Sequence, residues 1–256
     1  MKKTLLVLGI GPAQVDLIKA GKEMGLRVIA CAYDKNGPGK DLVDDFKQID
    51  IKDIEAVKNY AVLQEVDFIY SMGLELSVST IAIVSEDLGL PCFVTTETFT
   101  KIKNKAVWRE KLGSTRGNVK FQTGKKVEDF RFWSIYPAIL KPVDGSGQRG
   151  VYKVDSFESV QKYFDQSIKF SNSKQLIIEK YVDGPEISVN TFIENGELKF
   201  FIVSDRFSYD EFPGGIIKEH YIPSKIINKD IEKIIYQMVS KVIELLKFTT
   251  RHIYLH

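Results

Sequence analysis

A short apolar run that ends in a lysine and a glycine-rich loop, within residues 136–150, sets the strongest limit on how this chain folds. Residues 138–140 predict a buried strand that leads into Lys141 and Pro142. Glycine and serine are frequent in the loop that follows, at Gly145, Ser146, Gly147 and Gly150. Glycine lets the backbone approach a ligand, and outward N–H groups backed by a lysine can hold phosphate oxygens. The segment therefore indicates a phosphate site or, as the simpler alternative, a turn between two strands.

The composition is that of an ordinary globular protein and gives no sign of a polyanionic partner. Of the 256 residues, 44% are hydrophobic and 27% are charged, and the formal net charge is +2. A charge this small does not indicate nucleic acid or an anionic membrane as a partner. The apolar run from Leu5 is too short for a signal peptide, so we expect a cytoplasmic protein. Cys31 and Cys92 lie in or beside apolar runs and are expected to be buried thiols in a reducing compartment.

Residues 1 to about 95 alternate between apolar strands and amphipathic helices. Residues 4–9 form a continuous apolar run, a glycine turn follows, and a helix then leads to a second strand at residues 27–31. Two further helices are expected to begin at Asp53 and at Leu74, with a third strand between them. This alternation is typical of a doubly wound parallel α/β sheet.

The first glycine turn, Gly9 to Gly11, raises the alternative of a dinucleotide site in a nicotinamide-dependent oxidoreductase. Such a site needs a third glycine three positions on, where this chain has Gln14. Asp34 follows the second strand and fits the alternative, but an acid there is a weak signal by itself. We prefer a tight turn that lets the helix pack on the strand, and we keep the oxidoreductase as the less favoured hypothesis.

From about residue 118 the pattern changes to short strands joined by hairpins. Asn195–Gly196 predicts one of these hairpins, and Glu186 is expected to begin the strand before it. The returning strand is followed by a loop that contains Arg206 and leads to His220. Three other short strands are expected, at residues 119–121, 138–141 and 151–154. The change of pattern indicates a second domain of the α+β class.

Residues 96–112 are expected to form one helix ahead of this second domain, with Thr96 as its candidate cap. Basic residues load the helix with positive charge: Lys101, Lys103, Lys105, Arg109 and Lys111. For most of these lysines, a solvated surface is the interpretation that we prefer.

In order along the chain, these features resemble the ATP-grasp ligases. The resemblance rests on Asn104–Lys105, on Lys141 with its glycine-rich loop, and on the segment 179–182 followed by Glu186. It covers nearly the whole chain. Residues 205–223 look most similar to the carbamoyl-phosphate synthase large chain and to the L-amino acid ligases.

This resemblance implies a Rossmann-like α/β domain of the pre-ATP-grasp type, followed by an α+β ATP-grasp domain that is incomplete at its C-terminus. We place the first domain at residues 1–95, a connecting helix at 96–117 and the ATP-grasp domain at 118–256. Within the ATP-grasp domain, residues 118–185 would be the lobe that covers the nucleotide, and residues 186–256 would be a partial C-terminal lobe.

The resemblance also implies which residues bind ATP. Lys105 and Lys141 would contact the phosphates, because point charges suit a polyanion. The loop that would close over the phosphates contains Gly145, Ser146, Gly147 and Gly150. The residues expected to contact adenine, partly through the backbone, are Glu179, Lys180, Tyr181 and Val182. Glu186 would accept hydrogen bonds from the ribose hydroxyls.

The implied reaction activates a carboxylate as an acyl phosphate, with release of ADP, before an amine attacks. Arg206 and His220 are the catalytic candidates, as contacts of the γ-phosphate or of the carboxylate. The implied cofactors are ATP and Mg²⁺, and the implied partners are a small-molecule carboxylate and a small-molecule amine, with a homo-oligomer as a further option.

One part of the family pattern is not found. ATP-grasp ligases hold Mg²⁺ with an acid on a late strand and a Glu-x-Asn element, but after Ile243 the one acid is Glu244, which belongs to a helix. Two hypotheses follow from this difference. The chain is an ATP-dependent carboxylate–amine ligase with an incomplete catalytic half, or it is a nucleotide-binding protein without ligase activity.

Overall fold

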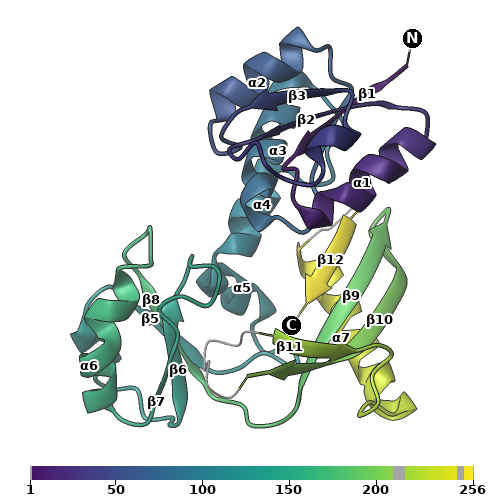
Figure 1. The fold of residues 1–256 in the computed structure, drawn as a ribbon. Helices are drawn as coiled ribbons and strands as arrows, with labels where there is room; N and C mark the ends of the chain where they lie inside the picture. The colour runs from purple at the N-terminus through teal and green to yellow at the C-terminus, as the bar shows by residue number, and fades with distance from the viewer. Residues whose placement is uncertain (1, 210–216, 247–250, 256) are drawn as a thin grey trace. The chain divides into compact units, whose positions relative to one another are not determined.

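The computed structural model describes residues 2–209, 217–246 and 251–255 (Figure 1). Contacts within the chain divide it into two units, residues 1–100 and residues 101–256. This division lies inside one helix, α4 (Thr96–Lys103). The boundaries after residues 95 and 117 that we expected from the sequence stay a proposal. None of the helices in the described ranges is long and apolar enough to cross a membrane.

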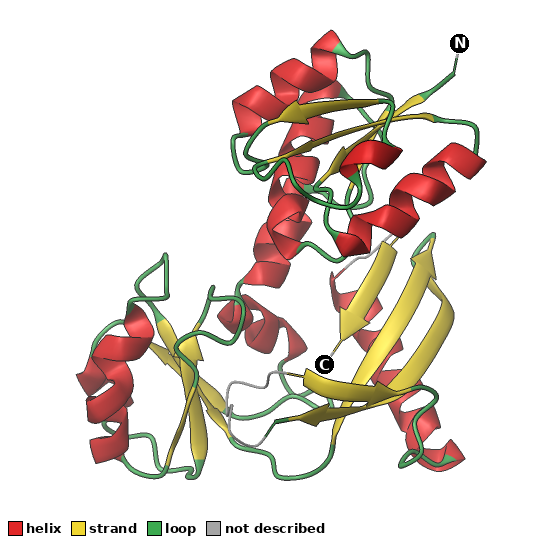
Figure 2. Ribbon diagram, in the orientation of Figure 1, coloured by secondary structure: helices red, strands yellow, loops and turns green. Residues whose placement is uncertain are grey.

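The first unit is a parallel sheet with helices on both of its faces (Figure 2). The strand order is β3-β2-β1-β4, and each neighbouring pair is parallel. Its elements are β1 (Thr4–Leu8), α1 (Pro12–Glu23), β2 (Arg27–Ala32), the 3₁₀ turn η1 (Lys40–Leu42), β3 (Asp45–Gln48), α2 (Ile54–Leu63), β4 (Phe68–Tyr70) and α3 (Glu75–Leu88). All of β1 is buried, because α1 packs against one face of the sheet while α2 and α3 pack against the other.

Gln14 fills the turn in which a dinucleotide would bind. Its Oε1 accepts from the Gly11 N–H at 2.9 Å, and its side-chain amide donates to the carbonyl of Met72. A Cβ atom built at Gly9, where φ is +102°, would lie 3.1 Å from the same Gln14 oxygen. The Gln14 side chain thus lies at the N-terminus of α1, where a Rossmann site places the pyrophosphate.

The second unit begins with a break that the sequence did not predict. The single helix expected over residues 96–112 is wrong, because the chain forms α4 and a separate helix α5 (Lys105–Leu112). Asn104 has an extended backbone, with φ −90° and ψ 109°, and its Oδ1 accepts from the N–H groups of Ala106 and Val107. Asn104 is therefore the N-cap of a new helix. The expected cap of α4 also differs, since Thr95 Oγ1 accepts from the Thr98 N–H and Thr96 is already helical.

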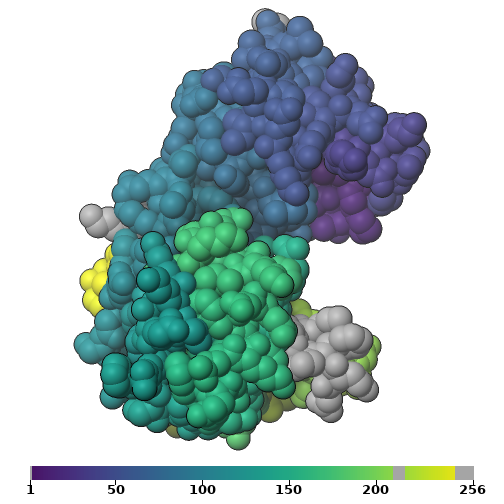
Figure 3. Space-filling model, turned by 90° about the vertical axis from the view of Figure 1, so that its left-hand side faces the viewer, coloured from purple at the N-terminus to yellow at the C-terminus, as the bar shows by residue number. Residues whose placement is uncertain are grey.

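An antiparallel sheet of four strands follows, in the order β5-β8-β6-β7. Its elements are β5 (Phe121–Gly124), the 3₁₀ turn η2 (Val127–Phe130), β6 (Ala138–Pro142), β7 (Tyr152–Val154), α6 (Phe157–Ile168) and β8 (Leu176–Lys180). One face of this sheet packs on α6 through Leu140, Val160 and Ile178. The other face packs on α5, where Ala106 contacts Ile177 and Val143. Figure 3 shows the surface of this lobe in teal to green.

The last sheet has the order β11-β10-β9-β12, again antiparallel. Its elements are β9 (Glu186–Glu194), β10 (Glu197–Ser208), β11 (Ile217–Tyr221), α7 (Lys229–Leu246) and β12 (Arg251–Leu255). Asn195 and Gly196 both have positive φ and form the predicted two-residue hairpin turn. One face of the sheet packs on α7, with Val189, Val203 and Val239 in the shared core.

The fold class expected from the sequence is confirmed, since an α/β unit precedes a unit of antiparallel sheets and helices. Three strands were not predicted. β3 is polar and lies at a sheet edge, β11 lies where a loop leading to His220 was expected, and β12 lies in a segment for which no strand was expected. Arg206 was expected in a loop, and this is wrong, because β10 continues to Ser208.

Candidate nucleotide site

Glu179, on β8, is a buried acid that lies between two half-buried cations. Its side chain is 6% exposed, and Oε2 accepts from Lys141 Nζ at 2.6 Å. Arg109 Nε donates to Oε1 at 2.8 Å, and Arg109 Nη2 reaches Oε2 at 3.3 Å. Lys141 and Glu179 meet because β6 and β8 are neighbours, with Ile139 opposite Glu179 and Lys141 two residues further along the same face. The guanidinium therefore contacts both carboxylate oxygens, while Lys141 shares one of them.

These two cations keep the buried carboxylate ionised. Burial raises the pKa of Glu179, but the hydrogen bonds and positive charges of Arg109 and Lys141 outweigh burial and hold this pKa below its usual value. Glu179 is thus an anion inside the lobe, held between one residue of α5 and one residue of β6.

Arg109 is the residue of this group that the sequence did not identify. It was grouped with the basic residues of a solvated helix, although its side chain is only 23% exposed. One signal was available, because Arg109 follows Lys105 by four positions and therefore lies on the same face of α5. Its partner Glu179 is 70 residues away in the sequence, so their contact was not visible without the structure.

Lys105, at the start of α5, hydrogen-bonds to the loop that follows β6. Asn104 caps α5, so Lys105 is its first residue, and the Lys105 N–H donates to the carbonyl of Val143 at 2.8 Å. Lys105 Nζ donates to the carbonyl of Gly145 at 2.7 Å. The structure therefore places Lys105 against the loop that follows β6.

The loop after β6 is fixed at both ends and exposed in its middle. The Asp144 carboxylate accepts from Ser171 Oγ and from the Ser173 N–H, each at 2.8 Å, and Ser167 Oγ donates to the carbonyl of Gly150 at 2.7 Å. Gly147 has φ +66° and is exposed, with Ser146 half-buried before it. The exposed N–H groups between two fixed ends are suited to hold an anion.

The end of β8 and the residues after it use part of their backbone hydrogen-bonding capacity within the lobe. The Lys180 N–H donates to the carbonyl of Lys120, and the Tyr181 N–H donates to the carbonyl of Pro137. The Tyr181 ring lies under Lys153, whose Nζ is 4.0 Å from the ring centroid, and the Val182 side chain is 65% exposed. Two backbone N–H groups of the segment expected to contact adenine are thus used within the lobe, and its exposed residues are Lys180 and Val182.

Glu186, Arg206 and His220 form a second group, on the other sheet of this unit. They lie in one row, because Arg206 on β10 is paired with Glu186 on β9 and with His220 on β11. Arg206 Nη1 donates to Glu186 Oε2, and the Glu186 side chain is 58% exposed. His220 Nδ1 lies 3.3 Å from Ser204 Oγ, which is buried. A strand register, not a loop, therefore brings together the two catalytic candidates and the expected ribose contact.

The residues in the described ranges do not fit a magnesium site. They contain no group of three or more His, Cys, Asp or Glu side chains placed to hold a metal ion.

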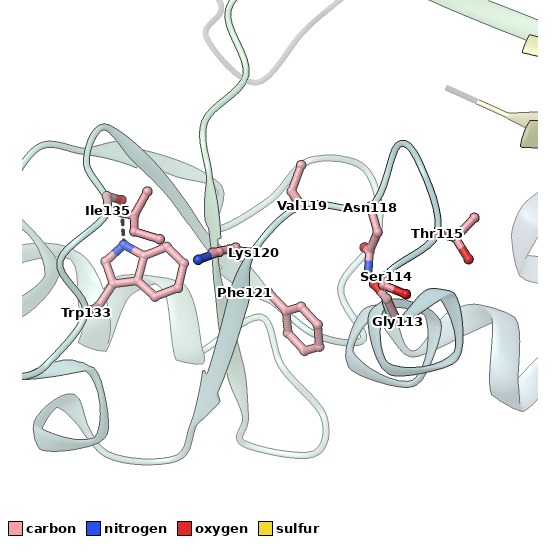
Figure 4. A pocket seen from close by; sticks show the side chains of 9 residues that line it. All are labelled: Gly113, Ser114, Thr115, Asn118, Val119, Lys120, Phe121, Trp133 and Ile135. Atoms are coloured by element: carbon pink, nitrogen blue, oxygen red, sulfur yellow. Dashed lines mark hydrogen bonds between the residues drawn. The ribbon is translucent and has the colours of Figure 1, made fainter. Parts of the chain in front are cut away.

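A separate pocket of about 490 Å³ lies beside the start of β5. Trp133 and Ile135 line one side of it, and Lys120 and Phe121 lie in its middle (Figure 4). The other side is lined by Gly113, Ser114, Thr115, Asn118 and Val119. Trp133 Nε1 donates to the carbonyl of Ile135 at 2.7 Å. Asn118 belongs both to this pocket and to the partners of Arg109, whose Nη1 lies 3.2 Å from Asn118 Oδ1.

Two comparisons with protein sequences give the same family. Residues 134–255 match the family model of the ATP-grasp domain. The ATP-grasp enzyme fsqD of Aspergillus fumigatus is 30% identical over 122 residues, which are 43% of this chain and 21% of that protein. A formate-dependent phosphoribosylglycinamide formyltransferase of Prochlorococcus marinus is 26% identical over 194 residues, 71% of this chain and 48% of the relative.

A comparison with solved structures agrees with the fold. The biotin carboxylase domain of a Hydrogenobacter thermophilus 2-oxoglutarate carboxylase, solved with MgADP, ADP and bicarbonate, has a TM-score of 0.82 and 16% identity. This match covers all of the present chain and 63% of that structure. The chain spans about half the length of the formyltransferases and less of the fungal enzyme. Residues 134–255 of this chain are an ATP-grasp domain.

Proposed function

We propose that this chain binds ATP through its ATP-grasp domain and serves an ATP-dependent carboxylate–amine ligase of the ADP-forming type. The observation that supports this most directly is the ionised Glu179, paired with Lys141 beside a loop that Lys105 contacts. A polyanion needs cations at this place, and an adenine amino group needs an acceptor. The names of the relatives point the same way, because one is a formate-dependent formyltransferase and another is called an ATP-grasp enzyme.

In the proposed reaction, a carboxylate oxygen of the substrate attacks the γ-phosphorus of ATP. The bond between this phosphorus and the oxygen that bridges to the β-phosphate breaks, which gives an acyl phosphate and ADP. The amine nitrogen of the second substrate then attacks the acyl carbon, and phosphate and a proton leave. Lys105 and Lys141 would hold the phosphates, and Glu186 would accept from the ribose. Arg206 and His220 would orient the γ-phosphate or the carboxylate from the neighbouring strands.

A nucleotide-binding protein without ligase activity is the second candidate. The absence of an acidic group for a metal from the described ranges favours it, because phosphoryl transfer from ATP depends on metal ions that neutralise the phosphates. The nicotinamide-dependent oxidoreductase is disfavoured by Gln14, whose side chain lies in the dinucleotide turn.

Calorimetric titration of purified residues 1–256 with ADP, ATP and NAD tests the proposal. We expect ADP and ATP to bind and NAD to give no heat. A panel of carboxylic acids and amines, with ADP release as the readout, then separates the ligase from the binding protein. Binding of NAD in preference to ADP would refute the assignment of the nucleotide to residues 134–255.

A further inference from the structure

The Glu179 carboxylate has two cationic partners, but a bound nucleotide would compete for one of them. Lys141 Nζ lies 2.6 Å from Glu179 Oε2, and the lysine side chain is 19% exposed. On the proposed function, on which this inference rests, Lys141 contacts the phosphates of ATP. An ammonium group on a flexible stem can move from a carboxylate to a phosphate.

Such a move would leave a buried anion with fewer partners unless another cation stayed in place. Removing one partner of a buried ion pair is costly, because the remaining charge has lost its compensation. Arg109 donates through Nε at 2.8 Å to Oε1, the oxygen that Lys141 does not use, and reaches the shared Oε2 through Nη2 at 3.3 Å. The planar guanidinium can therefore stay on the carboxylate when Lys141 leaves it.

Arg109 is itself held in one position. Its Nη1 lies 3.2 Å from Asn118 Oδ1, and the Asn118 amide donates to the carbonyls of Arg109 at 2.9 Å and of Gly113 at 2.8 Å. Asn118 therefore links the guanidinium to the C-terminal end of α5, where Gly113 is the C-cap. These contacts fix the position of the Arg109 side chain, unlike that of an ordinary solvated arginine.

We propose that Arg109 is a positioning residue of the nucleotide site. Its Nε holds Glu179 through Oε1 at 2.8 Å, and its Nη2 lies farther from Oε2, at 3.3 Å, so Oε2 can accept from the adenine amino group when Lys141 turns to phosphate. Arg109 thus stays on the Glu179 carboxylate, whereas Lys141 leaves it for the phosphates. Arg109 does not contact the nucleotide, and it affects binding only through Glu179, which accepts a hydrogen bond from the adenine amino group.

The test compares ADP with inosine diphosphate, which carries a carbonyl oxygen in place of the adenine amino group. Titration calorimetry is run on residues 1–256 at pH 7.5, unsubstituted and as Arg109→Gln and Arg109→Lys. Arg116→Gln is the matched control, because Arg116 is an exposed arginine of the same segment. We expect the unsubstituted chain to prefer ADP by about tenfold, the factor that corresponds to one hydrogen bond to a charged group.

With Arg109→Gln, we expect the affinity for ADP to fall by about tenfold and the preference over inosine diphosphate to shrink below about threefold, since Lys141 then stays on Glu179. Arg109→Lys restores most of the preference, and Arg116→Gln leaves it unchanged. A loss of structural stability alone would weaken both ligands equally and leave the preference intact.

The outcomes separate the two proposals. If the unsubstituted chain binds no adenine nucleotide, the proposed function is overturned and this inference with it. If it binds ADP and a folded Arg109→Gln variant keeps the full preference, this inference alone is overturned. Should Arg109→Gln fail to fold by circular dichroism, Asn118→Ala replaces it, because it removes the support of the guanidinium. A preference that is unchanged in Asn118→Ala would then overturn the inference.

Discussion

At the scale of single residues, Lys141 is the cation whose loss should affect the nucleotide most directly. Replacing Lys141 with alanine leaves Glu179 paired with Arg109, so the lobe should still fold. The affinity for ADP should fall by roughly 10- to 100-fold, the equivalent of about 1.5–3 kcal/mol for a hydrogen bond to a charged group. Titration calorimetry measures this loss, and Lys125→Ala, at an exposed lysine of the same lobe, is the control. Equal losses in the two variants would mean that the lysines act only as a diffuse basic surface.

Glu179 should also contribute to the pH dependence of stability. Arg109 and Lys141 hold its pKa in the folded chain below the usual value. The contribution is therefore present above the pKa of the unfolded chain, about 4.3, and is lost as the pH falls through the lower folded pKa. At pH 7, Glu179→Gln leaves two half-buried cations without their buried anion and should cost at most about 3–5 kcal/mol of unfolding free energy.

The pH dependence of this difference is the check. Urea unfolding at pH 7 and near pH 3 should show a large gap between the original chain and Glu179→Gln at pH 7. The gap should narrow as the pH falls below about 4.3, because the unfolded chain then takes up a proton on Glu179 that the folded chain, with its lowered pKa, resists. If the gap is the same at both pH values, the carboxylate is not ionised in the folded chain.

The sequence named candidate residues one by one, but it did not show which distant residues contact one another. Residues such as Lys141 and Gly150 lie inside one continuous motif, and a motif is readable locally. Arg109 and Glu179 are 70 positions apart, and Arg206 meets His220 only through the register of β10 and β11. Contacts of this kind depend on tertiary packing, which residue types and spacing do not encode locally.

At the scale of elements, periodicity gave the strands and helices where the apolar pattern is strong, as in β1 and α7. It failed at the join of α4 and α5, because Asn104 is tolerable inside a helix by propensity alone. The break is set instead by the Lys105 N–H, which donates to Val143 in the loop after β6. β3 was not predicted because its sequence is mostly polar and has no apolar run, although its backbone pairs with β2 at the edge of the sheet.

The loop after β6 gives a prediction that separates backbone conformation from packing. Gly150 has φ +74°, and a Cβ there would lie 2.9 Å from Phe170 Cδ2 and 3.0 Å from the carbonyl of Ser167. Gly147 has φ +66°, but a Cβ there would meet nothing within 4 Å. Gly147→Ala should cost about 1–2 kcal/mol from its positive φ alone. Gly150→Ala should cost about 1–3 kcal/mol more, because its Cβ also crowds α6 and the segment after it.

Fluorescence can report the unfolding of this lobe by itself. The chain has two tryptophans, and Trp133 lies in the core between the β5–β8 sheet and α6. In a Trp108→Phe background, urea unfolding followed through Trp133 gives the stability of the lobe for both glycine variants. Equal costs for Gly147→Ala and Gly150→Ala would show that the contacts at Gly150 relax without penalty.

At the scale of the whole molecule, the two groups of candidate residues are better suited to binding a nucleotide than to catalysing phosphoryl transfer from it. The first group is Lys141 and Glu179 on the sheet of β6 and β8, with Lys105 on α5. The second group, Glu186, Arg206 and His220, lies on the sheet of β9, β10 and β11. The described ranges supply cations for phosphates but no cluster of acids for a metal. Metal ions contribute several kcal/mol to phosphoryl transfer, and each 1.36 kcal/mol is a factor of ten in rate.

We therefore expect purified residues 1–256 to bind ADP weakly, with an affinity that changes little when Mg²⁺ is added. We also expect them to release ADP from ATP several orders of magnitude more slowly than a working ligase. A coupled assay for ADP over a range of Mg²⁺ concentrations measures this, with Lys141→Ala as the blank for residual site-dependent turnover. Steady ADP release that needs both Mg²⁺ and an amine substrate would contradict the prediction, because it would require metal ligands that act together only once the substrates are bound.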